Sequence, residues 1–566
     1  MKQRLADYIA DFLVENGITS CFSVVGGGAM YLNDALGHKK NLHCIYNHNE
    51  QACTIAAEAY ARYTGKPAVV CVTTGPGATN AITGVVCAYQ GSVPMIVISG
   101  QVRYSTSVYA SGLPLRSRGI QEFDITGSVN NMTKYCELIK EPSKIKYYLE
   151  KALYEATTGR PGPVWLDIPL DVQATIIETD RLCRFEEQDD NNSFDDTIIP
   201  NIIEKLKESK HPLILAGNGI RTAGASEKFN ELMEKLKVPL VTTLGSVDAI
   251  STENKYFIGK CGSLGDVAGN YAVEECDLLF SIGSRLSYSV TGFDYENFAP
   301  RAYKIISDVD EVELEKDSIN ADVKICIDAK ILIDKLGSYL KNQLEEKKQW
   351  IEELRKKKLE FPLVLDKHYA DIHPNIYVFY EKLTNMLPEN SAIVVSVGSA
   401  RTIGSKISKI KKGTRFITNS VTAAMGYCLP AAIGVSVARE NKKTILVTGE
   451  GSLQMNLQEL QTLVHNKQNV SIFVLNNGGY HSIRLTQTHY FQGNYVGMGE
   501  ESKDISFPDL KKISSAYCIP FKRCSNPALL EECVQWGINH NELCICEIML
   551  SKEYLVEPKR QQKLNV

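Results

Sequence analysis

The sequence lacks the patterns that mark several classes of protein. It has no uninterrupted apolar run of about 18 residues, which a membrane-spanning helix requires. It contains no Cys-x-x-Cys pair and no His-Glu-x-x-His motif, two spacings by which metal sites are often recognised. A net charge of -4 is small for 566 residues and gives no electrostatic reason to bind nucleic acid or an anionic membrane. The expected partners are therefore small molecules.

The 16 cysteines stand mostly in apolar, strand-like runs such as Ile325-Cys326-Ile327. Thiols in such runs are usually buried and reduced rather than paired as disulfides. Residues 1–18 have the pattern of an amphipathic helix with acidic residues, unlike a secretory signal or a transit peptide. These features predict a cytoplasmic protein.

A chain of 566 residues is too long for one hydrophobic core and predicts about three domains. Two charged segments have the composition of linkers, residues 186–196 and residues 342–358, and we expect the second to be a solvated helix. Elsewhere, short apolar runs alternate with helical patterns, which is typical of parallel sheets covered by helices on both faces. We expect three doubly wound α/β domains, spanning residues 1–180, 195–340 and 365–550.

In the third domain, glycines and polar residues directly follow two apolar runs. Residues 449–452 (Gly-Glu-Gly-Ser) follow one run, and residues 476–480 (Asn-Asn-Gly-Gly-Tyr) follow the other. Ligands of doubly wound sheets bind beyond the carboxyl ends of the strands, so both segments should lie at one site. A carboxylate, an amide oxygen and a glycine carbonyl suit Mg²⁺, and the N–H groups at a helix start suit phosphate. The two segments predict a cation and diphosphate site.

In the first domain, Glu50 follows an apolar run and opens a predicted helix. An acidic residue in the first turn is common because it complements the helix dipole. Residues 73–80 (Thr-Thr-Gly-Pro-Gly-Ala-Thr-Asn) and 92–102, taken with the two segments of the third domain, closely resemble acetolactate synthase and its relatives, which use thiamine diphosphate (ThDP). The resemblance covers nearly the whole chain, including residues 215–220, 242–246, 275–293 and 306–310.

This resemblance implies ThDP and Mg²⁺ as cofactors, and pyrimidine-binding, central Rossmann-like and diphosphate-binding domains. It implies that Glu50 activates the cofactor by bonding its aminopyrimidine and that Gln121 lies near the reacting centre. His48 and His481 are nearby groups that can carry protons near neutral pH, and a structural contact is the alternative for each. The implied Mg²⁺ ligands are Glu450, Asn477 and the backbone of Gly479. Further residues expected around the cofactor are Gly26, Gly75, Asn80, Val397, Gly398, Ser399, Ala400, Ala423, Met425, Gly449, Gly451, Ser452, Tyr480 and Ile483.

Two of these positions have specific roles in the family. Met425 matches the bulky apolar residue that holds the cofactor bent, and the carbonyl of Ala423 matches the acceptor of its amine. Glu450 is a departure, because the family motif has aspartate there, and the longer side chain must fold back to reach a cation. A non-catalytic ThDP-binding or nucleotide-binding protein is therefore the alternative from another functional class.

The resemblance also concerns the middle domain and the assembly. Acetolactate synthase holds a non-redox FAD in that domain, and the matching positions here are Arg160, Gly217, Gly219, Thr243, Leu244, Gly283, Arg285 and Asp308. Ordinary strand-end turns of a Rossmann-like domain would give the same pattern, so FAD is left open. The family builds each active site between two subunits, which implies a homodimer or a homotetramer.

Three positions depart from acetolactate synthase where its second substrate binds: Leu170, Ser289 and Thr486 replace a Lys, an Arg and a Trp. Losing the arginine removes a charge-assisted partner for a carboxylate, which favours a neutral acceptor. Residues 32–36, 118–125 and 480–487 resemble ThDP enzymes of surface-polysaccharide and unusual-sugar biosynthesis. The predicted reaction is decarboxylation of a 2-oxo acid such as pyruvate, with transfer of its acyl unit to an aldehyde, ketone or keto sugar. Acetolactate synthase with a divergent pocket and a simple 2-oxo acid decarboxylase are the alternatives.

Overall fold

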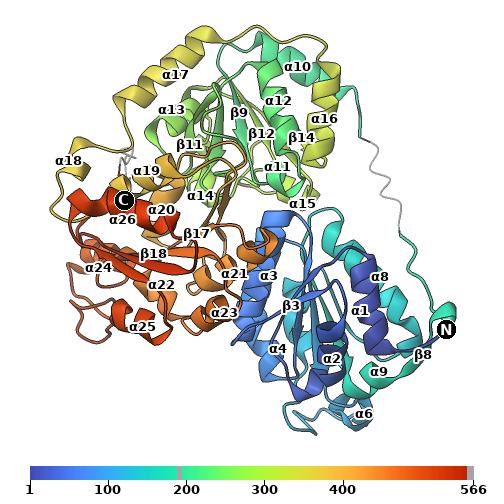
Figure 1. Cartoon of the computed structure of the whole chain (residues 1–566). Helices are drawn as coiled ribbons and strands as arrows, with labels where there is room; N and C mark the ends of the chain where they lie inside the picture. Colours follow the sequence, from blue (N-terminus) through green and yellow to red (C-terminus); the bar gives the residue numbers. More distant parts are fainter. Residues whose placement is uncertain (188–193, 558–566) are drawn as a thin grey trace.

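The computed structural model describes residues 1–187 and 194–557, so part of the linker predicted at 186–196 lies outside the described residues. Figure 1 shows an N-terminal domain in blue to cyan, a C-terminal domain in orange to red beside it, and a central domain in green to yellow above both. Each contains a six-stranded parallel sheet between helices, which confirms the predicted α/β class with three doubly wound domains. Among the described residues, no helix has both the length and the apolar character needed to cross a bilayer.

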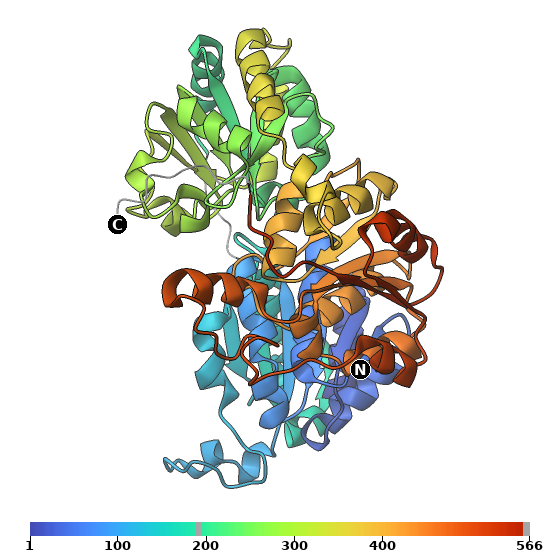
Figure 2. The same cartoon turned by 90° about the vertical axis from the view of Figure 1, so that its left-hand side faces the viewer.

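The N-terminal sheet is parallel, and its inner strands are apolar because helices cover both of its faces. From edge to edge it holds β3 (His43–Tyr46), β2 (Ser20–Ser23), β4 (Ala68–Val72), β5 (Met95–Gln101), β7 (Pro163–Pro169) and β6 (Tyr135–Leu138). Its helices are α1 (Leu5–Glu15), α2 (Met30–His38), α3 (Glu50–Thr64), α4 (Pro76–Asn80), α5 (Ile82–Gly91), α6 (Val108–Ser111), α7 (Ile125–Val129), α8 (Ile145–Thr157) and α9 (Leu170–Ala174). A short antiparallel pair, β1 (Lys2–Arg4) with β8 (Ile176–Glu178), closes the domain. The segment around α6 projects from it in Figure 2.

The C-terminal sheet repeats the strand order of the N-terminal sheet when the strands of each are counted along the chain. Its strands, from edge to edge, are β16 (Arg415–Ile417), β15 (Ala392–Val395), β17 (Thr444–Gly449), β18 (Val470–Asn476), β20 (Cys544–Met549) and β19 (Phe521–Cys524), all parallel. Its helices are α18 (Asp366–Tyr369), α19 (Ile376–Met386), α20 (Ser399–Ile407), α21 (Cys428–Ala438), α22 (Glu450–Gln454), α23 (Glu459–His465), α24 (His481–Phe491), α25 (Leu510–Ala516) and α26 (Leu530–Asn539).

The central sheet has the strand order found in dinucleotide-binding folds. It runs β11 (Phe257–Cys261), β10 (Leu240–Thr243), β9 (Pro212–Ala216), β12 (Leu278–Ile282), β13 (Tyr303–Asp308) and β14 (Val323–Cys326), all parallel. Its helices are α10 (Ile198–Glu208), α11 (Gly219–Thr222), α12 (Ser226–Leu236), α13 (Val267–Glu275), α14 (Tyr288–Thr291), α15 (Glu311–Leu314), α16 (Ala329–Tyr339) and α17 (Lys348–Glu360).

Helix α17 corrects one expectation. Residues 342–358 were expected to form a solvated helix, but α17 buries Trp350, Ile351 and Leu354 against the central domain. The indole N–H of Trp350 also donates to the carbonyl of Pro212. The many lysines and glutamates of this segment occupy the outer face, while a narrow apolar stripe is sufficient to dock the helix. The segment is therefore part of the packed structure.

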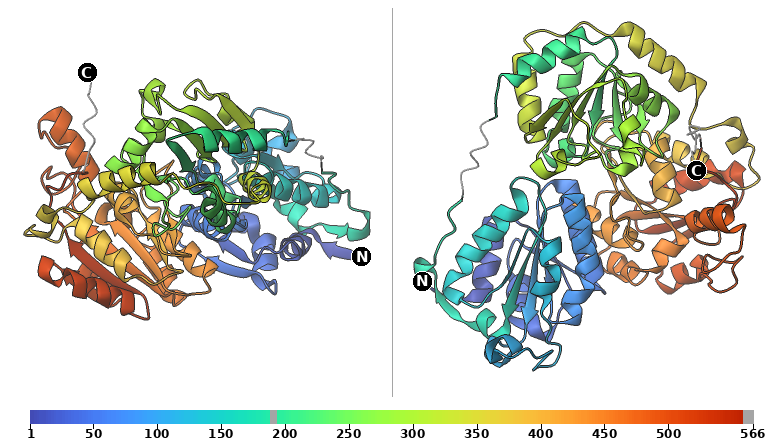
Figure 3. Two further views of the ribbon diagram at one scale, coloured as in Figure 1. Left: turned by 90° about the horizontal axis from the view of Figure 1, so that it is seen from above. Right: turned by 180° about the vertical axis from the view of Figure 1, so that it is seen from behind.

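The N-terminal and C-terminal domains pack closely along α3 and α21. The seen-from-behind view of Figure 3 places these two domains side by side beneath the central one. A Cβ atom on Gly434 would lie 2.0 Å from the carbonyl oxygen of Ala56, so only glycine permits this approach. The many alanines of α3 also allow the two helices to approach closely. This packing fixes the end of α3 at which Glu50 stands.

Asp248 joins all three domains from the central one. Its carboxylate accepts from Nε of Arg415 at 2.7 Å, and Arg415 also donates to the carbonyls of Tyr63 and Arg62 in the N-terminal domain. Burial opposes ionisation of Asp248, yet Arg415 and Arg221 keep its pKa below the ordinary value. The acid is therefore charged and paired in the folded protein.

We expect Asp248→Asn to lower the stability of the folded chain by roughly 3–5 kcal/mol, because it leaves the buried Arg415 without its counter-ion. Denaturant unfolding followed by circular dichroism measures the loss. Asp334, in an exposed pair with Lys228, provides the control. Its change to Asn should cost under about 1 kcal/mol. Equal effects at the two sites would contradict the role assigned to Asp248.

Candidate active site

Each domain places some of its predicted site residues at the point where the strand order of its sheet reverses, which is where doubly wound sheets bind ligands. In the N-terminal sheet this point lies between β2 and β4, and Gly26 and Gly75 follow these strands. In the C-terminal sheet it lies between β15 and β17, which Gly398 and Glu450 follow. In the central sheet it lies between β9 and β12.

The C-terminal domain brings four segments of the chain into one place. The hydroxyl of Ser452 accepts from the Ser396 hydroxyl at 2.8 Å and from the N–H of Gly426 at 3.0 Å. The hydroxyl of Ser399 lies 2.8 Å from Nδ1 of His481. The expected diphosphate residues Val397, Gly398, Ser399 and Ala400, with Gly449, Gly451 and Ser452, thus meet at the starts of α20 and α22. Helix starts of this kind suit an anion.

Glu450 is buried and bends toward the loop at 477–479. Its Oε1 accepts from the N–H of Gly479 at 2.7 Å and from the N–H of Asn477 at 3.3 Å. Burial raises the pKa of this carboxyl to about 7. Both amides donate to Oε1, which leaves Oε2 available to a cation. Together with the amide oxygen of Asn477 and the carbonyl of Gly479, this is an all-oxygen donor set, which Mg²⁺ favours.

His481 is buried behind this loop and stacks on Tyr554, with ring centroids 3.7 Å apart. Within the part of the chain that the structure describes, its Nε2 has no hydrogen-bond partner. Burial lowers its pKa to about 4, so the ring is neutral near pH 7. The contact between its Nδ1 and Ser399 is the structural alternative expected for this histidine, and its role stays a prediction.

The segment at 423–426 lies next to these residues. Ala423 has a positive φ of 50°, a strained conformation for a side chain other than glycine that is often found at functional sites. Met425 is 39% exposed, which is high for a methionine in an apolar run. Tyr480 packs over Gly451, where a Cβ atom would come within 2.2 Å of its ring. Ile483, on α24, is also exposed.

The N-terminal domain gathers its own set around Glu50. Glu50 is the first residue of α3, and its Oε2 accepts from Nδ2 of Asn80 at 3.0 Å. Gly75 has a φ of 60°, and a Cβ atom there would lie 2.1 Å from the carbonyl oxygen of Gln121. The structure thus brings Glu50, Asn80, Gly75 and Gln121 to one sheet edge. His48 is exposed and contributes a backbone N–H to Glu459.

A cavity of about 600 Å³ lies at the strand reversal of the central domain, and residues of the other two domains complete its lining. Seven of the eight positions matched to FAD line it: Arg160, Gly219, Thr243, Leu244, Gly283, Arg285 and Asp308. Gly217 does not, and a Cβ atom there would meet the carbonyl of Gly283 at 2.0 Å, so backbone packing alone requires this glycine. Burial raises the pKa of Asp308. The volume is in the range of cavities that bind cofactors.

Sequence patterns did not single out several residues that contact the predicted ones. Glu459 is buried and accepts from Nδ2 of Asn47 and the N–H of His48, which ties the two ThDP-type sheets together. Arg484 and Tyr554 both contact Asn477. Of these residues, only Arg484 had a signal in the sequence. It is an arginine seven residues after Asn477, on the helix that follows the Asn477 loop.

The three positions that depart from acetolactate synthase lie in three different domains. Leu170 begins α9, Ser289 lies in α14 beside the central cavity, and Thr486 lies on α24. Figure 1 shows α9 and α24 at opposite sides of the molecule. Within one chain these residues do not share a pocket, so a common acceptor site would combine residues of two copies.

The sequence matches three family descriptions in succession. They are the thiamine pyrophosphate enzyme N-terminal TPP binding domain at residues 3–127, the central domain at 199–336 and the C-terminal TPP binding domain at 396–548. A probable acetolactate synthase large subunit of Methanocaldococcus jannaschii is 33% identical over 559 residues, which cover 96% of this chain and 91% of that protein. The chain belongs to the ThDP-dependent acetolactate synthase family.

Other members of the acetolactate synthase family are similarly distant. The acetolactate synthase large subunit of Lactococcus lactis is 30% identical over 96% of this chain and 92% of its own length. The chloroplastic acetolactate synthase of Arabidopsis thaliana is 30% identical over 94% and 79%. The chain is therefore a ThDP-dependent enzyme of 2-oxo acid carboligation.

Proposed function

We propose that this enzyme decarboxylates a 2-oxo acid, pyruvate in the first instance, and joins the acyl unit to a neutral aldehyde, ketone or keto sugar. The observation that carries the proposal is the replacement of three acceptor-site residues by Leu170, Ser289 and Thr486, none of which is a cation. A second pyruvate would bind there with its carboxylate unpaired. A neutral carbonyl compound has no such requirement.

Mg²⁺ fits the residues at the end of β17 and β18. Oε2 of Glu450, the amide oxygen of Asn477 and the carbonyl of Gly479 would hold it, and the starts of α20 and α22 would hold the diphosphate. Burial raises the pKa of Glu450, so its charged form is unfavourable without a counter-ion. An adjacent cation would stabilise that charged form, which supports a cation at this site. The glutamate in place of aspartate is thus compatible with metal binding.

Glu50 is the proposed activating carboxylate. When bound, ThDP supplies the carbon nucleophile that attacks the 2-oxo acid. Glu50 would bond the aminopyrimidine, and the hydrogen bond from Asn80 already orients its carboxylate at the start of α3. Met425 and Ala423 would support the cofactor from the C-terminal domain, and Gln121 would face the reacting atoms.

We infer that each active site forms between two copies of the chain. Close to Glu50 in sequence, hydrogen bonds between the N-terminal and C-terminal domains of one chain join Asn47, His48 and Gln51 to Asn456 and Glu459. Asn80, the partner of Glu50, ends α4, which lies apart from α22 and α24 in Figure 1. A second copy would bring the missing half to each site.

FAD remains the ligand we propose for the central cavity. Four arginines line the cavity (Arg62, Arg160, Arg285 and Arg401), which suits a dinucleotide diphosphate. Asp308 ends β13, where a ribose hydroxyl could be bonded. Arg160 already pairs with Asp310 and Glu313, so its contribution to an anion would be reduced. Arg62 and Arg285 also face carboxylates, those of Glu58 and Glu313, so Arg401 is the strongest of the four candidates to meet the diphosphate.

Acetolactate formation is the second candidate function, because the relatives at 30–33% identity bear that name. The two candidate reactions differ only in the carbonyl compound that accepts the acyl unit. With pyruvate as the only substrate, we expect acetolactate to be a minor product, and adding a neutral aldehyde or ketone should divert most of the acyl unit to a mixed acyloin. Mass spectrometry of the products measures the ratio.

The matched variant restores the family pattern. Ser289→Arg combined with Thr486→Trp should shift the product ratio back toward acetolactate by about 10–100-fold, since a hydrogen bond to a charged group is worth about 1.5–3 kcal/mol. Thr488→Val, on the same helix, is the control and should leave the ratio unchanged. Efficient acetolactate formation by the wild type, undiminished by any neutral acceptor, would replace our proposal with the acetolactate synthase reaction.

A further inference from the structure

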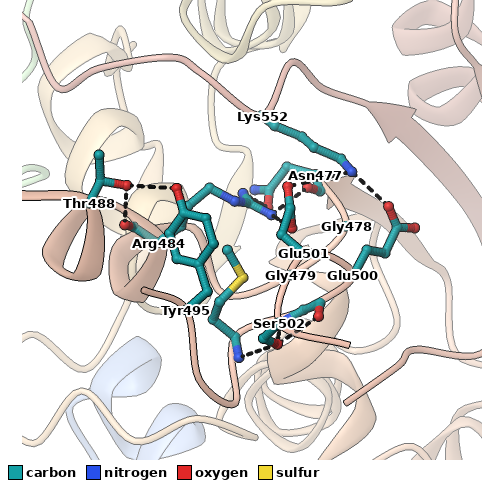
Figure 4. A network of polar contacts seen from close by, with 12 residues as sticks. Asn477, Gly478, Gly479, Arg484, Thr488, Tyr495, Glu500, Glu501, Ser502 and Lys552 are labelled. Carbon is teal, nitrogen blue, oxygen red and sulfur yellow. Dashed lines mark hydrogen bonds and ion pairs between the residues drawn. The ribbon is translucent and has the colours of Figure 1, made fainter. Parts of the chain in front are cut away.

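Arg484 is a buried cation that contacts Asn477 twice. From α24, its Nη1 donates to Oδ1 of Asn477 at 3.2 Å and its Nη2 donates to the backbone oxygen of the same residue at 3.2 Å. Nη2 also pairs with Glu501 at 3.0 Å. Figure 4 shows the guanidinium directed toward Asn477 and Glu501. Only 6% of Arg484 is exposed, so these contacts are shielded from solvent.

These contacts fix the orientation of the Asn477 amide. A guanidinium has donors only, so the amide atom that faces Arg484 must be the oxygen. On the other side, Nδ2 of Asn477 donates to the hydroxyl of Tyr554 at 3.3 Å. A carboxamide oxygen has two lone pairs, and Arg484 uses one of them. The other is available to a cation. If the amide were turned over, an NH₂ group would face the cation instead.

Residues 494–503, which we call the strap, hold Arg484 and the Asn477 loop together. The N–H of Tyr480 donates to the carbonyl of Met498 at 2.7 Å, and the N–H of Glu500 donates to the carbonyl of Gly478 at 3.2 Å. Cβ atoms on Gly479 or Gly499 would lie 2.3 Å from the opposite backbone, so both glycines are needed. Glu501 of the strap then neutralises Arg484.

The C-terminal segment supports the same arrangement from behind. Lys552 pairs with Glu500 at 2.7 Å and lies 3.6 Å from Glu501. Two residues later, the ring of Tyr554 stacks on His481 while its hydroxyl meets Asn477. Helix α24, the strap that follows it and residues 552–554 therefore meet around Asn477, and Figure 4 shows Arg484, Glu501 and Lys552 of these segments.

We propose that Arg484 is a positioning residue for the cation site: it holds the amide oxygen of Asn477 toward the metal, with Glu501 and Tyr554 as its supports. This inference rests on the proposed function, in which Asn477 is a Mg²⁺ ligand. Glu501 compensates the positive charge that Arg484 brings close to the metal. The guanidinium therefore orients the amide of Asn477 while adding little net positive charge near the cation site.

The test is calorimetric titration of Mg²⁺ into the full-length protein in the presence of ThDP. Arg484→Met removes every donor, and we expect it to weaken Mg²⁺ binding by about 10–100-fold, the usual effect of losing a group that orients a metal ligand. Arg484→Lys keeps the charge and one donor, and should recover most of the affinity. Tyr554→Phe keeps the ring on His481 but loses the hydroxyl, and should weaken binding by roughly threefold to tenfold.

The outcomes separate this inference from the proposed function. If the wild type binds no Mg²⁺ with ThDP, the proposed function fails. If the wild type binds but Arg484→Met binds equally well or more tightly, the positioning role is overturned, and tighter binding would mean that the guanidinium opposes the metal. Thermal unfolding of each cofactor-free variant shows whether it folds. Should Arg484→Met not fold, an unchanged Mg²⁺ affinity in Tyr554→Phe would overturn the proposal.

Discussion

Glu50→Gln should lower kcat by about a hundredfold or more while folding and ThDP binding stay close to wild type. The glutamine is nearly isosteric, and its carbonyl oxygen can keep the hydrogen bond from Asn80. It cannot supply the negative charge that favours the reactive tautomer of the aminopyrimidine, and general acid–base contributions of this kind are typically worth about 10²–10⁴-fold. The measurements are single-turnover release of CO₂ from pyruvate and calorimetry of ThDP binding.

Glu141→Gln is the matched control for this variant. Glu141 lies in the same domain, is half exposed and pairs with Lys144 on the surface. Its replacement removes the same charge at a distance from the proposed site, so kcat should be unchanged. If Glu50→Gln kept nearly full activity, the assignment of Glu50 as the activating group would be wrong.

The strand ends explain why much of the site could be predicted from the sequence. Apolar runs such as residues 444–448 are typical of buried strands, and parallel strands bring their carboxyl ends to one edge. Glycine and polar residues after such runs therefore marked Gly75, Gly398 and Glu450 before the fold was known. The family resemblance then assigned chemistry to them, which strand positions alone cannot do.

Contacts between distant segments could not be predicted in the same way. Tyr554 reaches Asn477 from 77 residues away in sequence, and nothing in its local pattern indicates this. The burial of His481, which lowers its pKa, depends on the same C-terminal segment. Helix α17 was expected to be solvated because its composition is dominated by charge, whereas three apolar side chains decide its packing. The composition of a segment averages over both faces of a helix, whereas its packing depends on the residues of one face.

Glu450→Ala should abolish Mg²⁺-dependent retention of ThDP. The variant removes the anionic ligand and the acceptor of two loop amides, so neither the metal nor the loop at 477–479 is held. In the wild type without cofactor, a folded-state pKa of about 7 lies above the unfolded value. This carboxyl therefore favours the folded state at low pH, and the contribution is lost as pH rises from about 4.5 to about 7. Mg²⁺ needs the charged form, so thermal stabilisation by Mg²⁺ and ThDP should grow between pH 6 and 8 in the wild type.

Glu450→Ala should show no such stabilisation at any pH, and unchanged ThDP affinity in this variant would mean that the metal is held elsewhere.

Mixing the two inactive proteins, Glu50→Gln and Glu450→Ala, extends the test to the assembly. If each site combines Glu50 of one copy with Glu450 of another, half of the randomly formed dimers contain one intact site. The mixture should then recover about a quarter of wild-type activity, because a two-fold symmetric dimer has two equivalent sites. Sites built within single chains would give no recovery, since every chain in the mixture lacks one of the two carboxylates.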